Sequence, residues 1–102
     1  MKTRVVILAE QGPPKVMTVE TVDIGAPGPD EVQIRQNVIG FNFMDIYQRS
    51  GLYPLDLPSG IGLEAAGTIE EVGGNVSGFE VGERVAYATA PQGAYAEFRN
   101  FA

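Results

Sequence analysis

Hydrophobic and polar residues alternate along residues 31–38, where Val32 and Ile34 are flanked by charged or amide side chains. Alternation with a period of two predicts a strand that buries one of its faces. Five further short segments are rich in β-branched or aromatic residues and are separated by Gly and Pro, which is typical of strands joined by turns. These segments are 4–9, 16–24, 65–72, 81–88 and 94–101. The pattern therefore predicts a protein built mainly from β-strands.

One segment, near residues 42–50, carries the signals of a helix. Asn42 is a favoured N-cap residue, and Asp45 places a carboxylate in the first turn, where it can bond back to the N-cap. The apolar face of this helix is supplied by Phe43, Met44, Ile46 and Tyr47. Gly51 provides the stop, and residues 53–62 are expected to form a loop. We expect a mostly antiparallel β-barrel or sandwich with this one short helix, in a single domain over residues 1–102.

Composition narrows the class of protein. The chain has 102 residues, of which 44% are hydrophobic and 20% charged, a balance typical of soluble globular proteins. Its net charge of −6 disfavours a nucleic-acid partner, because phosphate binding needs a concentrated basic surface. No apolar run approaches the length of a membrane span, and no cysteine pattern indicates secretion. We expect a cytoplasmic protein that binds neither nucleic acid nor membrane.

A glycine motif at residues 60–65 matches the loose form of a dinucleotide-binding fingerprint. That chemistry requires a helix N-terminus directly after the glycines, aimed at the pyrophosphate. Here a proline-bearing loop precedes the glycines, and the strand-like residues 67–72 follow them. The sequence therefore predicts no phosphate-binding loop in this chain.

Two groups of residues are candidates for chemistry. Residues 42–54 bring an amide, two phenols and a guanidinium into one helix and the loop that follows it. On local grounds alone, capping by Asn42 and Asp45 and packing by Tyr47 and Tyr53 are the favoured interpretation. Glu64 is a lone acid among small apolar residues, and such a carboxylate is either paired or functional.

The order of the motifs resembles that of a known family. The chain contains Asn-x-x-Asp-x-Tyr-x-Arg-x-Gly-x-Tyr-Pro from Asn42, then Gly-x-Glu-x-x-Gly from Gly62, and then Val-Gly-x-x-Val-x-x-Phe-x-x-Gly-x-Arg-Val from Val72. Gly-Ala-Tyr-Ala-Glu from Gly93 completes the series. Together they resemble the zeta-crystallin-type quinone oxidoreductases of the medium-chain dehydrogenase/reductase superfamily, from about Arg4 to the end of the chain.

The resemblance implies a GroES-like β-barrel that forms the catalytic domain. Full-length members continue into a Rossmann domain that binds the nucleotide, and then return to complete the barrel. The last predicted strand here runs to residue 101 with no closing turn. We therefore expect an incomplete catalytic domain without its nucleotide-binding domain, inactive alone and inclined to self-associate as a homo-oligomer through uncovered strand edges.

The resemblance also implies a zinc-independent reductase. Relatives with alcohol dehydrogenase activity carry a zinc-binding cysteine where Asn42 stands and a zinc-binding histidine where Leu63 stands. This chain has no cysteine and no histidine, so no metal site of that kind is expected. The implied reaction is hydride transfer from NADPH to a quinone or another electron-poor conjugated carbonyl.

Site residues follow from the same resemblance. The residues expected to line the nicotinamide side of the cleft are Asn42, Phe43, Met44, Asp45 and Ile46. Tyr47 and Tyr53 are expected to be catalytic, donating hydrogen bonds to the acceptor oxygen, and a surface salt bridge is expected for Arg49. Two alternatives stay open: an enoyl reductase of the same superfamily, and a non-catalytic GroES-like module for assembly or binding.

Overall fold

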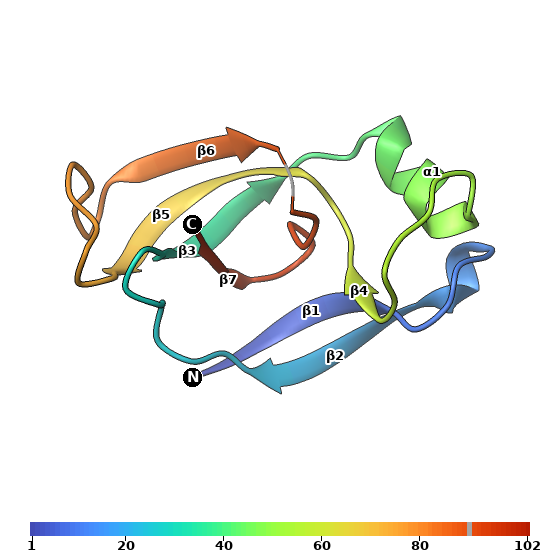
Figure 1. Cartoon of the computed structure of the whole chain (residues 1–102), viewed down its shortest axis with the longest axis horizontal. Coiled ribbons are helices and arrows are strands. Elements are labelled where there is room, and N and C mark those ends of the chain that lie inside the picture. Colours follow the sequence, from blue (N-terminus) through green and yellow to red (C-terminus); the bar gives the residue numbers. More distant parts are fainter. Residues whose placement is uncertain (90) are drawn as a thin grey trace.

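The computed structural model describes residues 1–89 and 91–102 and places the strands in two antiparallel sheets, with one α-helix beside them (Figure 1). The first sheet has the order β2-β1-β4, with β1 at Lys2–Leu8, β2 at Met17–Asp23 and β4 at Ser59–Gly60. The second has the order β6-β5-β3-β7, with β3 at Val32–Ile39, β5 at Glu64–Val72, β6 at Arg84–Ala88 and β7 at Phe98–Phe101. The α-helix α1 spans Phe43–Ser50, and the short 3-10 helix η1 spans Pro14–Val16.

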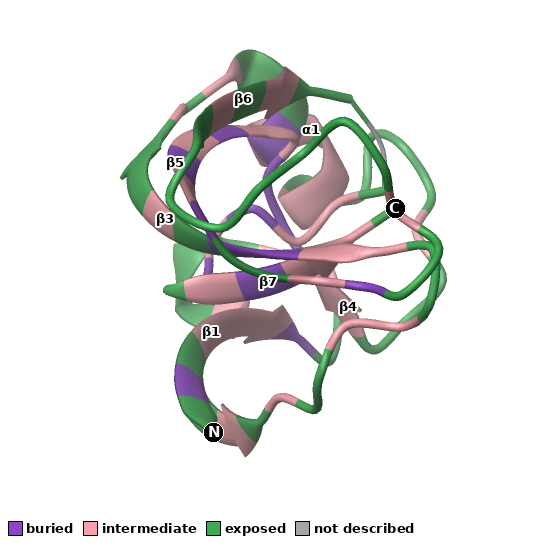
Figure 2. Ribbon diagram, turned by 90° about the vertical axis from the view of Figure 1, so that its left-hand side faces the viewer, coloured by how far each residue is buried: buried purple, intermediate pink, exposed green. Residues whose placement is uncertain are grey.

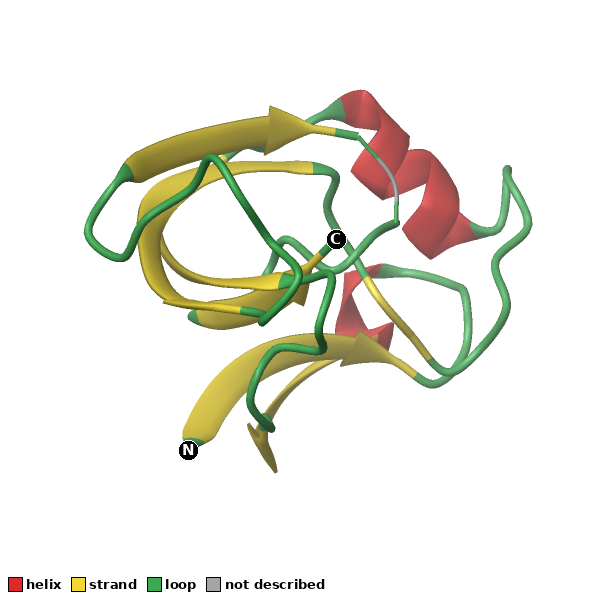
Figure 3. Cartoon of the chain, turned by 60° about the vertical axis from the view of Figure 1, so that its left-hand side comes forward, coloured by secondary structure: helices red, strands yellow, loops and turns green. Residues whose placement is uncertain are grey.

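Strands β3 and β5 curve strongly because their pairing is interrupted by bulges. The register between them shifts at Gln33/Ile34 and again at Gln36/Val38. A bulge bends its strand and increases the local twist, and Figure 3 shows both strands wrapping around the interior. The bending turns a four-stranded sheet into most of a barrel wall.

Backbone hydrogen bonds between β1 and the segment just before β7 join the second sheet to the first. Val5 and Ala96 form an isolated antiparallel bridge, and the Val6 N–H donates to the Tyr95 carbonyl at 2.9 Å. Next to them, Arg4 and Glu97 form an exposed ion pair with an N–O distance of 3.0 Å. The hydrogen bond from the Arg4 guanidinium holds the pKa of Glu97 below its ordinary value. These contacts give a partly open barrel.

The core lies between the two sheets. Its buried apolar residues are Leu8, Ile34, Ile61, Ala65, Ile69, Ala94 and Ala96. In β5 the buried positions alternate with outer ones, as a strand with one buried face requires. Figure 2 shows buried positions along β1, β5 and β7, whereas most outer loops are exposed.

A polar network also crosses the barrel interior. The Gln36 amide donates to the carbonyls of Ala94 and Ala96, each at 2.8 Å, and its oxygen accepts the Tyr87 hydroxyl. Arg99 is 8% exposed and donates to that same hydroxyl at 3.1 Å. Its guanidinium also lies over the rings of Tyr87 and Phe101, with centroid distances of 5.2 and 4.8 Å. Hydrogen bonds and aromatic faces together compensate the burial of this cation.

The structure confirms a mainly β fold with one helix starting after Asn42, and it differs from the predicted elements in three places. The expected loop at 53–62 contains β4, which pairs with Ile7 and Leu8. The strand expected at 81–88 begins at Arg84, because Gly82 takes a positive φ of 93° in a turn. The strand expected at 94–101 begins at Phe98, because the N–H groups of residues 94 and 95 bond the carbonyls of Gly62 and Ile61 instead.

In the described residues, no helix combines the length and the apolar character needed to cross a bilayer.

Candidate active site

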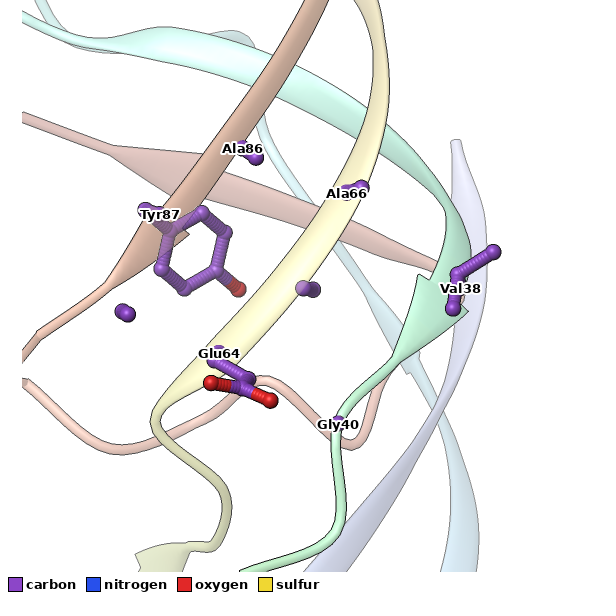
Figure 4. A pocket seen from close by; sticks show the side chains of 8 residues that line it. Val38, Gly40, Glu64, Ala66, Ala86 and Tyr87 are labelled. Atoms are coloured by element: carbon purple, nitrogen blue, oxygen red, sulfur yellow. The ribbon is translucent and has the colours of Figure 1, made fainter.

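Two adjoining hollows lie where the start of α1 meets the ends of β3, β5 and β6. The helix hollow has a volume of about 260 Å³ and is lined by Asn42, Met44, Leu63, Glu64 and Ala88. The sheet hollow has a volume of about 460 Å³ and is lined by Val38, Gly40, Glu64, Ala65, Ala66, Ala86, Tyr87 and Ala88. Glu64 and Ala88 line both, so the two hollows form one cleft, part of which is drawn in Figure 4.

The helix hollow brings together the two positions at which the resemblance implies zinc ligands in other proteins. Asn42 and Leu63 both line it, with Met44 beside them. Amide, aliphatic and thioether side chains are poor ligands for zinc, which prefers thiolates, imidazoles and carboxylates. Among the described residues, no group of three or more His, Cys, Asp or Glu is placed to hold a metal ion.

Glu64 extends its carboxylate between β5 and the end of β3, beside Gly40 (Figure 4). A Cβ atom at Gly40 would lie 2.0 Å from Glu64 Oε1 and 2.2 Å from its Cγ, so only glycine leaves room for this side chain. The Gly40 N–H donates to the Glu64 carbonyl at 3.0 Å and holds the two backbones together. Within the described part of the chain, the carboxylate has no hydrogen bond and no ion pair, so it is not the paired acid that was one of the two expectations.

A buried carboxylate, that of Asp45, holds the first turn of α1 in place. Asp45 is 2% exposed, and its Oδ2 accepts the Asn42 N–H at 3.1 Å and the Tyr95 hydroxyl at 2.7 Å. The predicted capping by Asp45 is thus confirmed, and Tyr95 is a partner that the sequence did not reveal. Because the carboxylate points inward, we place Asp45 behind the cleft rather than in its lining.

The Tyr95 ring reaches Asp45 by passing over Gly62. A Cβ atom at Gly62 would lie 2.5 Å from Tyr95 Cδ1, and this residue has a positive φ of 94°. No helix follows it, because β5 begins at Glu64. The rejection of the dinucleotide fingerprint is therefore confirmed, and Gly62 serves the packing of an aromatic ring instead.

We expect Tyr95→Phe to lower the free energy of unfolding by about 1–2 kcal/mol at neutral pH, because it removes one hydrogen bond to a carboxylate. Burial and the hydrogen bond to Asp45 raise the pKa of Tyr95. A group with a raised pKa contributes its full stability below the pKa that it has in the unfolded chain, which is about 10 for tyrosine. This contribution is lost as pH rises through the pKa that the group has in the folded protein. The difference between wild type and Tyr95→Phe in urea unfolding should therefore shrink above about pH 10.

Tyr53→Phe is the matched control for this experiment, because Tyr53 is 46% exposed and its hydroxyl has no hydrogen bond among the described residues. Its unfolding curve should follow that of wild type at each pH. An equal loss for both variants would show that the Tyr95–Asp45 hydrogen bond is not the cause.

The two predicted catalytic tyrosines lie together, outside the lining of both hollows. The rings of Tyr47 and Tyr53 meet edge to face, with centroids 5.7 Å apart, and Phe43 stacks on Tyr47 at 6.4 Å. Neither tyrosine hydroxyl has a partner among the described residues, so both are available as donors. Of the residues predicted for the cofactor, Asn42 and Met44 line the helix hollow, whereas Phe43 is 73% exposed and Ile46 is half-buried outside it.

Among the described residues, Arg49 has no partner for the expected surface salt bridge. Its guanidinium donates to the Gly12 carbonyl at 2.6 Å, and the Gly12 N–H donates back to the Arg49 carbonyl at 2.7 Å. The Gln11 amide donates to the carbonyls of Gln48 and Tyr53, each at 2.8 Å. The turn after β1 thus holds the end of α1 and the loop that carries Tyr53.

Several residues of the cleft were missed by the sequence analysis. The small residues that leave the sheet hollow open are Gly40, just after β3, Ala66 on β5, and Ala86 and Ala88 on β6. Small residues at outward positions of adjacent strands could have indicated it, but only once the strand register was known.

A mostly antiparallel, partly open barrel with a helix beside a rim cleft defines a GroES-like domain. The chain belongs to the family described as the alcohol dehydrogenase GroES-like domain, whose family model matches residues 28–100. The quinone oxidoreductase of Pseudomonas aeruginosa is 53% identical to this chain over 90 residues, which make up 87% of this chain and 28% of that protein. Quinone oxidoreductase 1 of Escherichia coli is 43% identical over 101 residues, 98% of this chain and 31% of that protein.

Other relatives carry related names. The 2-haloacrylate reductase of Burkholderia sp is 42% identical over 97 residues, 91% of this chain and 29% of that protein. Among solved structures, Escherichia coli quinone oxidoreductase complexed with NADPH matches with a TM-score of 0.90 at 41% identity, covering 96% of this chain and 30% of that chain. The resemblance to quinone oxidoreductases is thereby confirmed. The chain spans 28–31% of the length of these curated relatives.

Proposed function

We propose that this chain is the substrate-side domain of a zinc-independent NADPH:quinone oxidoreductase, which transfers hydride from NADPH to a quinone or a similar conjugated carbonyl. The observation that carries the proposal is the helix hollow, where Asn42 and Leu63 stand at the two positions at which the resemblance implies zinc ligands in other proteins. The similarity to proteins named quinone oxidoreductase supports the same reaction class.

The residues of the helix hollow fit a nicotinamide ring. Met44 and Leu63 offer apolar surface for a flat ring, and Asn42 has an amide that can both donate and accept a hydrogen bond, as a carboxamide requires. NADPH, when bound, supplies a hydride that reduces the acceptor together with one proton from water, leaving NADP⁺ and the reduced acceptor. The chain's own part is to orient the ring, exclude water and hold Asn42 in place through Asp45.

Tyr47 and Tyr53 are proposed to lie on the acceptor side. Their free hydroxyl groups can donate to the carbonyl oxygen that gains negative charge during hydride transfer. Their rings, with Phe43, offer an aromatic surface on which a quinone can stack. The acceptor would then be held between this aromatic cluster and the helix hollow.

A second candidate is reduction of an activated carbon–carbon double bond. It is favoured by the similarity to the 2-haloacrylate reductase and to an acryloyl-coenzyme A reductase of Sulfurisphaera tokodaii, which is 44% identical over 75 residues. The same cleft would serve, since hydride delivery needs the same position of the ring. The substrate assay described below separates the two.

The exposed apolar run at residues 38–44 supports a further part of the proposal. Val38, Phe41 and Phe43 are 66%, 71% and 73% exposed, and they lie beside the cleft at the end of β3 and the start of α1. Several large, exposed apolar side chains in one short segment are typical of a contact with another domain or chain. We propose that the nucleotide-binding domain covers it in the full-length protein, and that the isolated chain self-associates through it.

The test is NADPH oxidation with a small quinone, measured for this chain and for the full-length protein that carries it. We expect turnover in the full-length protein and none in the chain alone. Turnover with an acrylate but not with a quinone would favour the second candidate. No oxidation with either acceptor, together with a ring of defined size in solution, would replace the proposal with a non-catalytic assembly module.

A further inference from the structure

The carboxylate of Glu64 holds a central position in the proposed cleft. It lines both the helix hollow and the sheet hollow, and in the described part of the chain it is the only charged side chain that lines either. Its neighbours there are mostly alanine and glycine, which cannot donate a side-chain hydrogen bond. The cleft therefore contains one negative charge in otherwise weakly polar surroundings.

This charge is not neutralised by the described residues. The two ion pairs found among them, Lys2–Asp23 and Arg4–Glu97, lie on other parts of the surface. An unpaired carboxylate creates a negative potential in the hollows that it lines. A ligand that carries positive charge in the cleft is favoured over a neutral one of the same shape.

Gly40 provides the space that the Glu64 side chain occupies. The missing Cβ at Gly40 gives the Glu64 side chain its space, and the backbone bond between these residues holds that space in place. The side chain is half-buried rather than free in solvent. Its charge thus lies next to the residues proposed to orient the nicotinamide.

Building on the proposed function, we infer that Glu64 favours the oxidised over the reduced nicotinamide in this cleft by direct charge attraction. Breaking the C4–H bond of the neutral dihydronicotinamide sends a hydride, with both electrons, to the acceptor and leaves one positive charge on the ring. The acceptor is reduced and takes its proton from water. Because the ring charge develops as the hydride leaves, the Glu64 carboxylate stabilises the transition state more than the bound NADPH, and so speeds hydride donation.

Glu64→Gln in the full-length protein tests this inference, because glutamine keeps the size of the side chain and removes its charge. The dissociation constants of NADP⁺ and NADPH are measured separately by titration. We expect NADP⁺ to bind about tenfold more weakly to the variant, the change expected for loss of one partly screened charge pair. NADPH binding should stay within about twofold, which also shows that the variant is folded. The rate of NADPH oxidation should also fall, by a smaller factor than NADP⁺ affinity, because the ring carries only part of the positive charge at the transition state.

Glu70→Gln is the matched control, since Glu70 is an exposed acid on the same strand and lines neither hollow. It should leave the ratio of the two dissociation constants unchanged. Equal ratios in wild type and Glu64→Gln, with binding retained, would overturn the inference and leave the proposed function standing. Failure of the wild-type full-length protein to bind either nucleotide would overturn both.

Discussion

Replacing Gly67 with alanine should lower the free energy of unfolding by about 2–4 kcal/mol, because the site has no room for a methyl group. A Cβ atom there would lie 2.1 Å from the Arg35 carbonyl oxygen and 2.9 Å from Gln36 Cα. Both atoms belong to the backbone of the neighbouring strand β3, so the clash cannot be relieved by turning a side chain. Urea unfolding of the chain, followed by circular dichroism, measures the loss.

Gly74→Ala provides the comparison for this experiment. A Cβ atom at Gly74 would have no atom of the described residues within 4 Å, and the φ of Gly74 lies outside the left-handed region. Its free energy of unfolding should stay within about 0.5 kcal/mol of wild type. Similar losses for the two variants would mean that glycine in general, rather than the close approach of β3 to β5, stabilises the fold.

Replacing Tyr47 with phenylalanine should slow turnover of the full-length enzyme with a quinone by one to three orders of magnitude. The expectation follows from the proposed role of its hydroxyl as a donor to the acceptor oxygen. The ring contacts with Phe43 and Tyr53 would be preserved, because phenylalanine keeps the ring. Steady-state rates with one small quinone, compared at saturating NADPH, measure the effect.

The urea unfolding curve of Tyr47→Phe should coincide with that of wild type, since the hydroxyl has no partner among the described residues. Turnover equal to wild type would return Tyr47 to a packing role. In that case the same comparison for Tyr53→Phe decides whether the second hydroxyl is the donor.

Local patterns were enough to predict most of the strands and the start of α1, because alternation and capping depend on residues close in sequence. The Asn42–Asp45 bond is such a local feature, and it occurs as expected. The partner of the same carboxylate, Tyr95, lies fifty residues further along the chain. No periodicity or spacing connects those two positions, so only the folded barrel reveals the contact.

In the candidate site, too, local features could be predicted from the sequence, whereas contacts between distant segments could not. The motif order indicated the segment around α1, and the structure places Asn42 and Met44 in the cleft. The cleft itself depends on Gly40, Ala66 and Ala88, which lie just after β3, on β5 and on β6. The register of the strands decides which small residues face outward together. This register shifts at two bulges, which the alternating pattern of β3 does not predict.

The clasp formed by Gln11 and Gly12 has a consequence for protein engineering. These residues bond backbone and side-chain groups of α1 and of the Tyr53 loop, 37 to 42 positions away in the sequence. The aromatic surface proposed for the acceptor is therefore held in position by a turn that contributes no aromatic side chain to it. A library that aims to change the range of acceptors gains a second point of control by varying residue 11, which acts on the backbone that carries Tyr53.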